Sequence, residues 1–427
     1  MIKKLYLTQA LIPLALPLLL LAASCGKDDS PQNHTQDPTQ EPAQELPAVG
    51  FYNNAEGSPV FAMLKAAKNT IDIEIYEMAD PDVLAAIRNA LSKQVRIRVI
   101  REPDPLGDPC KIFDPFFEKD DPSCIDQKNL RDEILASGGA YIQFNKDKLC
   151  ADPKKPCFEH GKMVIVDGKA VLISTGNFNS SNLCNQARNP EKCNRDFSMI
   201  EKDPEIISFL ENVFENDLKT EKYDLKSMLE AVLPGDPHGT IQDKVTVSPY
   251  SQDPLVKLIG AATSSIRLEN QYLKERTINQ ALFDAAKRGV KIDITLASVC
   301  SFGPPQANDV ETTKSIFKPF DDAGISVRMM PNQFKINGHP GYMHAKAIVI
   351  DDQKAWVGSV NGSWSSTSNN REFGLVFSEA DRVASLVKIL TSDHESPDME
   401  TWQESIDCKK DRVQAVKNQN SLNTHLK

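Results

Sequence analysis

Two histidines, each followed two residues later by a lysine, are the side chains best suited to do chemistry. They are His160 with Lys162 in the first half of the sequence and His344 with Lys346 in the second. A neutral imidazole can attack phosphorus, a protonated imidazole can give its proton to a leaving oxygen, and ammonium groups offset phosphate charge. If both clusters meet at one phosphodiester, they supply groups on opposite sides of it. The repeated pairs therefore predict phosphodiester cleavage through a phosphohistidine.

Each pair opens a longer pattern with identical internal spacing. A histidine is followed after 2 residues by Lys, after 7 by Asp, after 15 by a hydroxyl residue and after 17 by Asn. The members are His160, Lys162, Asp167, Thr175 and Asn177 in the first copy and His344, Lys346, Asp351, Ser359 and Asn361 in the second. One such match has a chance probability on the order of 10⁻⁶ per start position. Two copies in register indicate a true repeat.

Buried strands are expected to carry these residues. The apolar runs 162–166 and 346–350 are typical of strands that are buried on both faces. A histidine and a lysine two residues apart face the same side of such a strand. Asp167-Gly168 then turns the chain into a second apolar strand, 170–173, which returns Asn177 to the histidine. Each half thus gathers an imidazole, an ammonium and a carboxamide.

The surrounding sequence is also written twice, at an offset of 195 residues. The matched segments are 66–76 with 261–271, 81–91 with 277–286, and 95–100 with 290–295. They predict strand, helix and strand, and such units need a crossover between parallel strands. We therefore expect an α/β fold of two tandem domains, 47–230 and 240–400, related by a pseudo-twofold axis. Each domain is expected to be a mixed β-sheet flanked by helices. A linker is expected at 233–239 and a flexible tail at 409–427.

The duplicated HxKx₄D pattern, followed by a hydroxyl residue and Asn, resembles the phospholipase D superfamily over essentially the whole body of the chain. Exported bacterial members of the phospholipase D and cardiolipin synthase group are the nearest type. The resemblance implies that an acidic residue orients each catalytic histidine. That role falls on Asp196 in Asn194-Arg195-Asp196 and on Glu372 in Asn370-Arg371-Glu372.

The same resemblance favours His160 as the nucleophile and His344 as the acid, although the near-symmetry of the copies leaves the reverse assignment open. The lysines and the asparagines Asn177 and Asn361 are expected to hold the non-bridging phosphate oxygens. Thr175 and Ser359 are expected to support them. Asp167 and Asp351, at strand ends, are expected to bind the turn backbone and to take no part in the chemistry. No metal and no cofactor are expected.

The N-terminus predicts export. Residues 1–24 combine MIKK with a short apolar run and small residues, as a signal peptide does, and the run is too short to span a bilayer. Leu21 to Cys25 resembles a lipobox, which predicts acylation of Cys25, with ordinary secretion as the alternative. Residues 25–46 are polar and rich in Pro and Gln, so a disordered tether is expected. The predicted location is periplasmic or on the outer membrane, through an N-terminal lipid anchor.

Eight cysteines remain when Cys25 is set aside, an even number that fits an oxidising compartment. Local pairing would join Cys110 with Cys124, Cys150 with Cys157 and Cys184 with Cys193, leaving Cys300 and Cys408, although spacing alone does not determine connectivity. The absence of any CxxC pair argues against a zinc site.

Net charge bears on the substrate. The formal charge is −10, and loss of Lys3 and Lys4 with the signal peptide makes it −12, without the broad basic footprint of a duplex-DNA binder. A monomeric phospholipid phosphodiesterase is therefore the first choice. The alternatives are a nuclease, a phosphatidyl transferase of the cardiolipin synthase type, and a non-catalytic binding lipoprotein. Apolar loops at the mouth of the site would favour lipid, and a basic groove would favour nucleic acid.

Other aromatic and imidazole side chains are expected to have structural or surface positions. Trp356 and Trp364 are predicted to pack in the core. Histidines without a motif are predicted on the surface or in the tether; these are His34, His238, His394 and His425. His339 is assigned to a loop.

Overall fold

The computed structural model describes residues 44–407, except 107–109, 115–120, 234–235 and 302–308. The predicted signal peptide, Cys25, most of the predicted tether, Cys408 and the predicted tail lie outside the described residues. Everything that follows concerns the unit that begins at Gln44.

The first half of this unit is built on a seven-stranded sheet in the order β1-β7-β6-β5-β2-β3-β4. Its strands are β1 (Gly50–Asn53), β2 (Thr70–Ile75), β3 (Arg96–Arg101), β4 (Ala140–Gln143), β5 (Lys162–Val166), β6 (Ala170–Ser174) and β7 (Phe197–Glu201). Its helices are α1 (Val60–Ala66), α2 (Pro81–Ser92), α3 (Pro122–Ala136), α4 (Lys146–Leu149), α5 (Pro204–Leu218) and α6 (Leu225–Leu229).

The second half has an eight-stranded sheet in the order β10-β18-β17-β16-β11-β12-β13-β19. Its strands are β10 (Val245–Val247), β11 (Ser265–Asn270), β12 (Lys291–Ala297), β13 (Ser326–Met330), β16 (Ala347–Ile350), β17 (Lys354–Gly358), β18 (Phe373–Phe377) and β19 (Glu400–Thr401). Its helices are α7 (Gln252–Gly260), α8 (Arg276–Lys287), α9 (Asp309–Asp322), α10 (Trp364–Ser368), α11 (Ala380–His394) and α12 (Trp402–Ser405). A small hairpin, β14 (Lys335–Ile336) and β15 (His339–Pro340), lies between β13 and β16.

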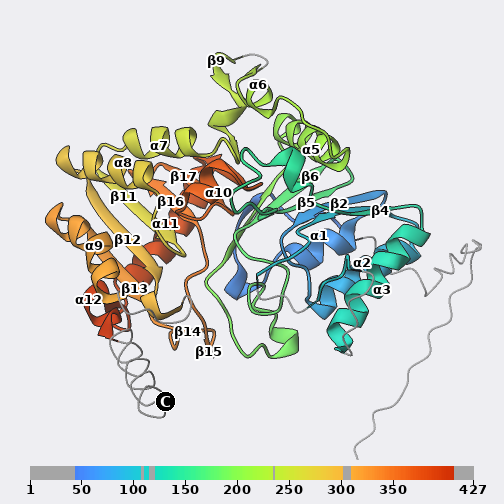
Figure 1. Cartoon of the computed structure of the whole chain (residues 1–427), viewed down its shortest axis with the longest axis horizontal. Coiled ribbons are helices and arrows are strands. Elements are labelled where there is room, and N and C mark those ends of the chain that lie inside the picture. The colour runs from blue at the N-terminus through green and yellow to red at the C-terminus, as the bar shows by residue number, and fades with distance from the viewer. Residues whose placement is uncertain (1–43, 107–109, 115–120, 234–235, 302–308, 408–427) are drawn as a thin grey trace, which may run out of the picture. The chain divides into compact units, whose positions relative to one another are not determined.

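The two strand orders match element by element, and β19 is an addition at one edge. In each sheet three neighbouring strands run parallel and the others are antiparallel. The fold is therefore α/β with two mixed sheets flanked by helices, as the repeat predicts. Figure 1 shows the first half in blue to green and the second in yellow to red.

Alternate residues of the central strands face two different cores. Val164 and Val166 of β5 pack with α1 and α2 on the outer face of the first sheet, and a matching core lies under α7 and α8 in the second half. Met163 and Ile165 face a third core, which contains residues of both sheets as well as α5 and α11. This shared core holds the two halves together and brings β5 and β16 into one structure.

The predicted linker at 233–239 lies between the two halves, and its described residues belong to a hairpin of β8 (Val232–Leu233) and β9 (Asp236–Thr240). Two expectations about individual side chains are wrong. Trp364 is 41% exposed rather than packed in the core, whereas Trp356 is buried as predicted. His394 is buried, with Nδ1 3.2 Å from Thr295 Oγ1 and Nε2 2.8 Å from Ser326 Oγ.

The three local disulfides are present as predicted. They join Cys110 with Cys124, Cys150 with Cys157, and Cys184 with Cys193. Cys300 is also disulfide-bonded, and its expected partner, Cys408, lies outside the described residues.

A search of the described residues for a helix of bilayer-spanning length and hydrophobicity finds none.

Candidate active site

The two histidine segments lie side by side with segments of the opposite half. The main chain at Glu159 forms a parallel bridge with Arg371, and His160 N donates to Arg371 O at 2.9 Å. In the same way Arg195 bridges to Met343, and His344 N donates to Arg195 O at 3.2 Å. Each histidine is therefore held by backbone that comes from the other sheet.

The segments from the opposite half also supply a carboxylate to each histidine. His160 Nδ1 lies 2.8 Å from Glu372 Oε2, and His344 Nδ1 lies 2.9 Å from Asp196 Oδ1. Because an ionised carboxylate can only accept, it fixes the tautomer that carries its proton on Nδ1 and leaves a lone pair on Nε2. The sequence identifies both acidic residues, but it does not indicate that each one orients the histidine of the opposite half.

Both carboxylates are themselves fixed by hydrogen bonds. Thr175 Oγ1 donates to Asp196 Oδ1 at 2.6 Å, and Asn182 Nδ2 donates to Asp196 Oδ2 at 2.7 Å. Asn370 Nδ2 donates to Glu372 Oε1 at 3.0 Å. The Ser359 hydroxyl accepts from Phe373 N at 3.0 Å, just as the Thr175 hydroxyl accepts from Phe197 N at 2.9 Å. Ser359 differs in its own donation, which goes to the main-chain oxygen of Phe373 at 3.4 Å and not to a carboxylate.

The two lysines of the motifs are fully buried. Lys346 Nζ donates to Thr175 O at 3.1 Å, which again crosses between the halves, and Lys162 Nζ lies 5.3 Å from the centre of the Tyr76 ring. Burial lowers the pKa of Lys162 to about 7 and that of Lys346 to about 8, although Glu372 and Asp196 oppose the shift. Burial of two ammonium groups is costly, and a bound phosphate anion would favour their charged form.

Burial also lowers the pKa of His160 and of His344 to about 4, against the opposing charge of each partner carboxylate. For the carboxylates, burial alone would raise the pKa, but the histidine and lysine beside each one lower it on balance. At neutral pH the site thus holds neutral imidazoles against ionised carboxylates. A neutral imidazole is what nucleophilic attack requires, and an arriving phosphate anion raises the pKa of the other imidazole so that it can act as an acid.

Two glycines of the first motif are required by close packing, one against the opposite half and one within the first half. A Cβ on Gly161, between His160 and Lys162, would lie 2.5 Å from the Phe373 ring of the other half. A Cβ on Gly176 would lie 2.6 Å from Asp196 Cγ. Both motif loops therefore pack directly against the carboxylate-bearing segments.

Asn177 does not present its amide in the predicted way, and the prediction for the Asn361 amide stays untested. Asn177 Nδ2 donates to Glu77 Oε2 at 3.1 Å, so this amide is already engaged by a carboxylate. The carbonyl oxygens Asn177 Oδ1 and Asn361 Oδ1 are buried without a hydrogen-bond partner. The structure thus places both residues in the motif loops and leaves the side-chain carbonyl oxygen of each without a hydrogen-bond partner.

Asp167 and Asp351 lie at strand-end turns, but they do not bind the turn backbone as predicted. Asp167 accepts from the N–H groups of residues 68–70, which lead into β2. Asp351 accepts from the N–H groups of residues 263–265, which lead into β11. Burial alone would raise the pKa of Asp351, but these hydrogen bonds lower it. Each aspartate therefore fixes the start of the neighbouring central strand.

Two buried ion pairs anchor the acidic segments across the halves. Arg371, next to Glu372, is bidentate to Asp217 of α5, with Nε–Oδ2 at 2.8 Å and Nη2–Oδ1 at 3.0 Å. Arg195, next to Asp196, is bidentate to Asp393 of α11 at 2.6 and 2.8 Å. We call these two pairs the cross-half clamps. The sequence signal for them is the Arg that precedes the acidic residue in both copies.

Sequence reasoning also misses two residues beyond the end of β2. The Tyr76 ring centre lies 4.9 Å from that of His160, and Glu77 accepts from Asn177 and from Asn179 Nδ2, the latter at 3.0 Å. Tyr76 ends the repeated segment 66–76 and Glu77 follows it, so the carboxyl end of the strand in that segment was the signal that could have identified them.

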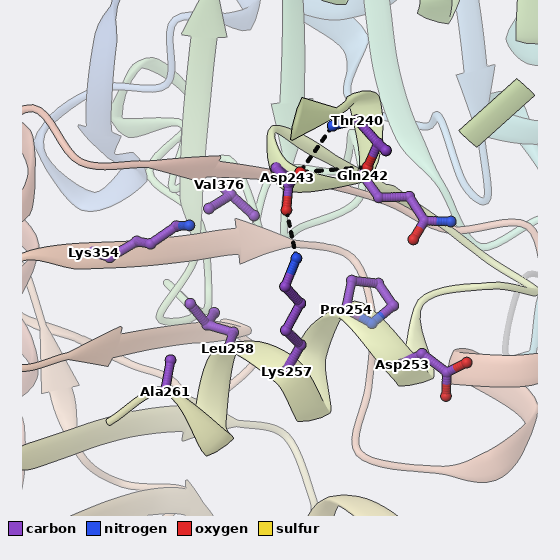
Figure 2. A pocket seen from close by; sticks show the side chains of 10 residues that line it. All are labelled: Thr240, Gln242, Asp243, Asp253, Pro254, Lys257, Leu258, Ala261, Lys354 and Val376. Atoms are coloured by element: carbon purple, nitrogen blue, oxygen red, sulfur yellow. Dashed lines mark hydrogen bonds and ion pairs between the residues drawn. The ribbon is translucent and has the colours of Figure 1, made fainter. Parts of the chain in front are cut away.

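A cavity of about 300 Å³ lies apart from these residues, between the segment 240–243, α7 and the strands β17 and β18. Figure 2 shows Lys257 pointing toward Asp243, 2.8 Å away, and Asp243 in turn accepts from Thr240 N. Two of the charged groups that line the cavity, Lys257 and Asp243, are thus paired with one another. Within the described part of the chain, no group of three His, Cys, Asp or Glu side chains could hold a metal ion.

Comparison with known proteins agrees with this geometry. The family model described as "Cardiolipin synthase, PLD-like domain" matches residues 60–218 and 255–394. Cardiolipin synthase A of Pseudomonas entomophila (strain L48) is 22% identical over 334 residues, which make up 74% of this chain and 60% of that protein. An uncharacterized protein of Streptococcus mutans serotype c is 27% identical over 137 residues, 30% of this chain and 27% of that protein. The chain thus spans less than two thirds of the length of either relative.

Among solved structures, the phosphatidylserine synthase of Haemophilus influenzae Rd KW20 is similar to this chain, with a TM-score of 0.59 at 12% sequence identity. The match covers 90% of this chain and 94% of the synthase chain. At this identity the likeness concerns the fold alone. The family match, in contrast, extends over both halves and most of the chain. The chain therefore belongs to the phospholipase D superfamily, with two PLD-like domains.

Proposed function

We propose that the chain is a phospholipase D-type phosphodiesterase that cleaves phospholipid phosphodiesters through a phosphohistidine. The observation that carries the proposal is the pair of buried histidines, each held within 2.9 Å of a carboxylate from the opposite half and each accompanied by a buried lysine. His160 Nε2 attacks phosphorus, and His344 protonates the leaving oxygen and then activates the water that releases the product. Lys162 and Lys346 offset the charge on the non-bridging oxygens.

Exposed apolar side chains near the histidines support a lipid substrate. Trp364, three residues after Asn361, is 41% exposed, and Lys155 Nζ lies 4.3 Å from its ring centre. Leu106 is 79% exposed, and its N–H donates to the hydroxyl of Tyr76, whose ring contacts His160. Aromatic and aliphatic side chains beside a lysine suit the boundary between lipid head groups and acyl chains. An exported location and an N-terminal lipid anchor would bring such an enzyme to its membrane.

Transfer to an alcohol is the second candidate reaction, because the family model is described as cardiolipin synthase. Water and an alcohol compete for the same phosphoenzyme, so both reactions use the same residues. Product analysis with and without added glycerol separates them, since transfer forms a new phosphodiester whereas hydrolysis releases phosphatidic acid.

The test compares the purified protein with its His160→Ala variant on phospholipid vesicles and on single- and double-stranded DNA, with a chelator present. The proposal predicts release of phosphatidic acid by the parent protein and a loss of roughly 10³-fold or more in the variant. His339→Ala is the matched control, because His339 lies outside the cluster, with its Nε2 3.3 Å from Gln186 Oε1. Cleavage of DNA alone would overturn the lipid assignment, and lipid cleavage that persists in His160→Ala would overturn the mechanism.

A further inference from the structure

A carboxylate that the proposed mechanism does not use lies beside the first motif loop. Glu77 follows β2, and its Oε2 accepts from Asn177 and from Asn179 at 3.1 and 3.0 Å. Its main-chain carbonyl also accepts from Phe178 N at 2.9 Å. The side chain is only partly buried. Both the charge and the position of Glu77 are thus fixed relative to the loop that carries Asn177.

Asn177 leaves an unsatisfied acceptor next to this charge. Its side chain is more than nine-tenths buried, and because Nδ2 is engaged by Glu77, Oδ1 is the atom left without a partner. A buried carbonyl oxygen without a hydrogen bond is unfavourable, so a bound group with an N–H or O–H donor would relieve it. A phosphate oxygen cannot do so, since it is itself an acceptor.

This acceptor pair adjoins the His344 side of the reaction centre. Thr175, two residues before Asn177, accepts from Lys346 Nζ at 3.1 Å, and Gly176 packs against Asp196, the partner of His344. Burial raises the pKa of Tyr342, and the negative charges of Asp196 and Glu77 raise it further. The Tyr342 and His344 ring centres are 5.8 Å apart.

We propose that Glu77 and Asn177 form a subsite for a primary ammonium group on the head-group alcohol of the substrate. The inference rests on the proposed function, in which His344 protonates the leaving head-group oxygen. The carboxylate offsets the positive charge and Asn177 Oδ1 accepts one N–H, so an ethanolamine-type head group fits both groups. A quaternary ammonium satisfies the charge but has no N–H for the amide oxygen, and a glycerol head group has donors but no charge.

The described residues of the opposite half form no equivalent subsite. Tyr272 occupies the place of Glu77 in the repeat, at the offset of 195 residues. Its hydroxyl interacts with Asn361 and Ser363, and the pKa of Tyr272 is raised, chiefly by burial. A neutral phenol offers no charge to an ammonium group. Head-group selection is therefore assigned to one side of an otherwise symmetric centre.

The first experiment measures kcat/KM for vesicles of phosphatidylethanolamine, phosphatidylcholine and phosphatidylglycerol with the parent protein, Glu77→Gln and Tyr272→Phe. The glutamine keeps an oxygen for the two asparagine amides and removes only the charge. We expect the preference for phosphatidylethanolamine over phosphatidylglycerol to fall roughly 10-fold or more in Glu77→Gln, the size of one lost charge-assisted hydrogen bond. Tyr272→Phe should leave this ratio unchanged. An equal loss on all three lipids in Glu77→Gln would overturn the subsite.

A second measurement does not depend on turnover and so separates this inference from the proposed function. Calorimetric titration compares binding of glycerophosphoethanolamine, glycerophosphocholine and glycerophosphoglycerol to the same three proteins. The subsite predicts the tightest binding for the ethanolamine compound, with that advantage lost in Glu77→Gln and kept in Tyr272→Phe. Equal binding of the three compounds by the parent protein would overturn the inference. Preferential binding without any cleavage of lipid would support the subsite and contradict the proposed function.

Discussion

Beyond β2 the first half of the molecule carries a carboxylate, Glu77, whereas beyond β11 the second half carries a phenol, Tyr272, at the matching place of the repeat. The histidine–carboxylate distances differ far less, at 2.8 Å for His160 and 2.9 Å for His344. Groups that handle the phosphate are thus alike in the two halves, while their surroundings differ. Cleavage of a phosphodiester needs matched groups on both sides of the phosphorus, one for attack and one for departure of the leaving group. The head group, in contrast, lies at one end of the substrate, so residues on one side of the site are enough to recognise it.

Histidine variants should separate the two halves most strongly. His344→Ala is expected to lose roughly 10³-fold or more in kcat on a phospholipid with an alkyl head group. With phosphatidyl-p-nitrophenol, the first half-reaction should slow by less than about tenfold, because p-nitrophenolate leaves without protonation by an acid. His160→Ala should lose comparable activity on both, since it removes the nucleophile. Burst kinetics of p-nitrophenolate release measure the difference. If His160→Ala keeps the fast release of p-nitrophenolate and His344→Ala loses it, His344 is the nucleophile and His160 is the acid.

The cross-half clamps provide the next comparison. Asp217→Asn and Asp393→Asn each break a buried ion pair, so we expect a loss of about 3 kcal/mol in the free energy of unfolding by urea. Because each clamp arginine precedes a histidine-orienting carboxylate, we also expect about a tenfold loss of kcat in the folded variants, equivalent to roughly 1.4 kcal/mol in the barrier.

Asp72→Asn is the matched control for the clamps, because Asp72 forms a mostly buried bidentate pair with Arg98 inside the first half. It should lose stability without the tenfold loss of kcat. If all three variants lose activity in proportion to stability alone, the clamps do not position the carboxylates.

The pH dependence should reflect the two buried lysines. Since burial lowers their pKa values to about 7 and 8, kcat/KM is expected to fall as pH rises above that range, by up to about tenfold per unit. Folding stability should change in the opposite direction. The unfolded chain binds more protons at these lysines than the folded one between about pH 7 and 10, so the free energy of unfolding rises with pH there. A flat kcat/KM profile from pH 6 to 9 would contradict the assigned role of the lysines.

The strand-end aspartates should give the smallest difference between the halves. Asp351 accepts hydrogen bonds from the hydroxyls of Thr263 and Ser264 as well as from backbone N–H groups, whereas Asp167 accepts from backbone N–H groups only. Asp351→Asn should therefore cost about 2 kcal/mol of unfolding free energy and Asp167→Asn about 1 kcal/mol. The pKa of Asp351 is lowered in the folded state, so its contribution is present above the unfolded value near 4 and is lost as pH falls. Urea unfolding at pH 7 and at pH 3 checks both statements.

Much of the fold could be predicted because the sequence repeats itself. A periodicity that appears twice at one offset fixes the matched strands and helices, such as α2 and α8, and the local cysteine pairs are close enough in sequence for short loops to join them. The motif residues could be selected for the same reason, since spacing identifies side chains that share a strand or a turn.

What the sequence could not reveal are contacts between segments that are distant along the chain. Asp196 is 148 residues from the histidine that it orients, and Glu372 is 212 residues from His160. No local pattern distinguishes this exchange from pairing within a half. Similarly, Trp364 looks like a core residue by composition, but the position of α10 at the surface leaves it exposed, and the amide of Asn177 is engaged by Glu77 from another strand end.

Chemical trapping tests the central claim most directly. His344→Ala is mixed with phosphatidyl-p-nitrophenol, quenched within a second, and its peptides are analysed by mass spectrometry under conditions that preserve phosphohistidine. Because this variant can form the intermediate but lacks the group that activates water, the account predicts a phosphatidyl adduct on His160. Rapid release of p-nitrophenolate with no adduct on His160, or with an adduct on a residue outside the histidine pair, would contradict it.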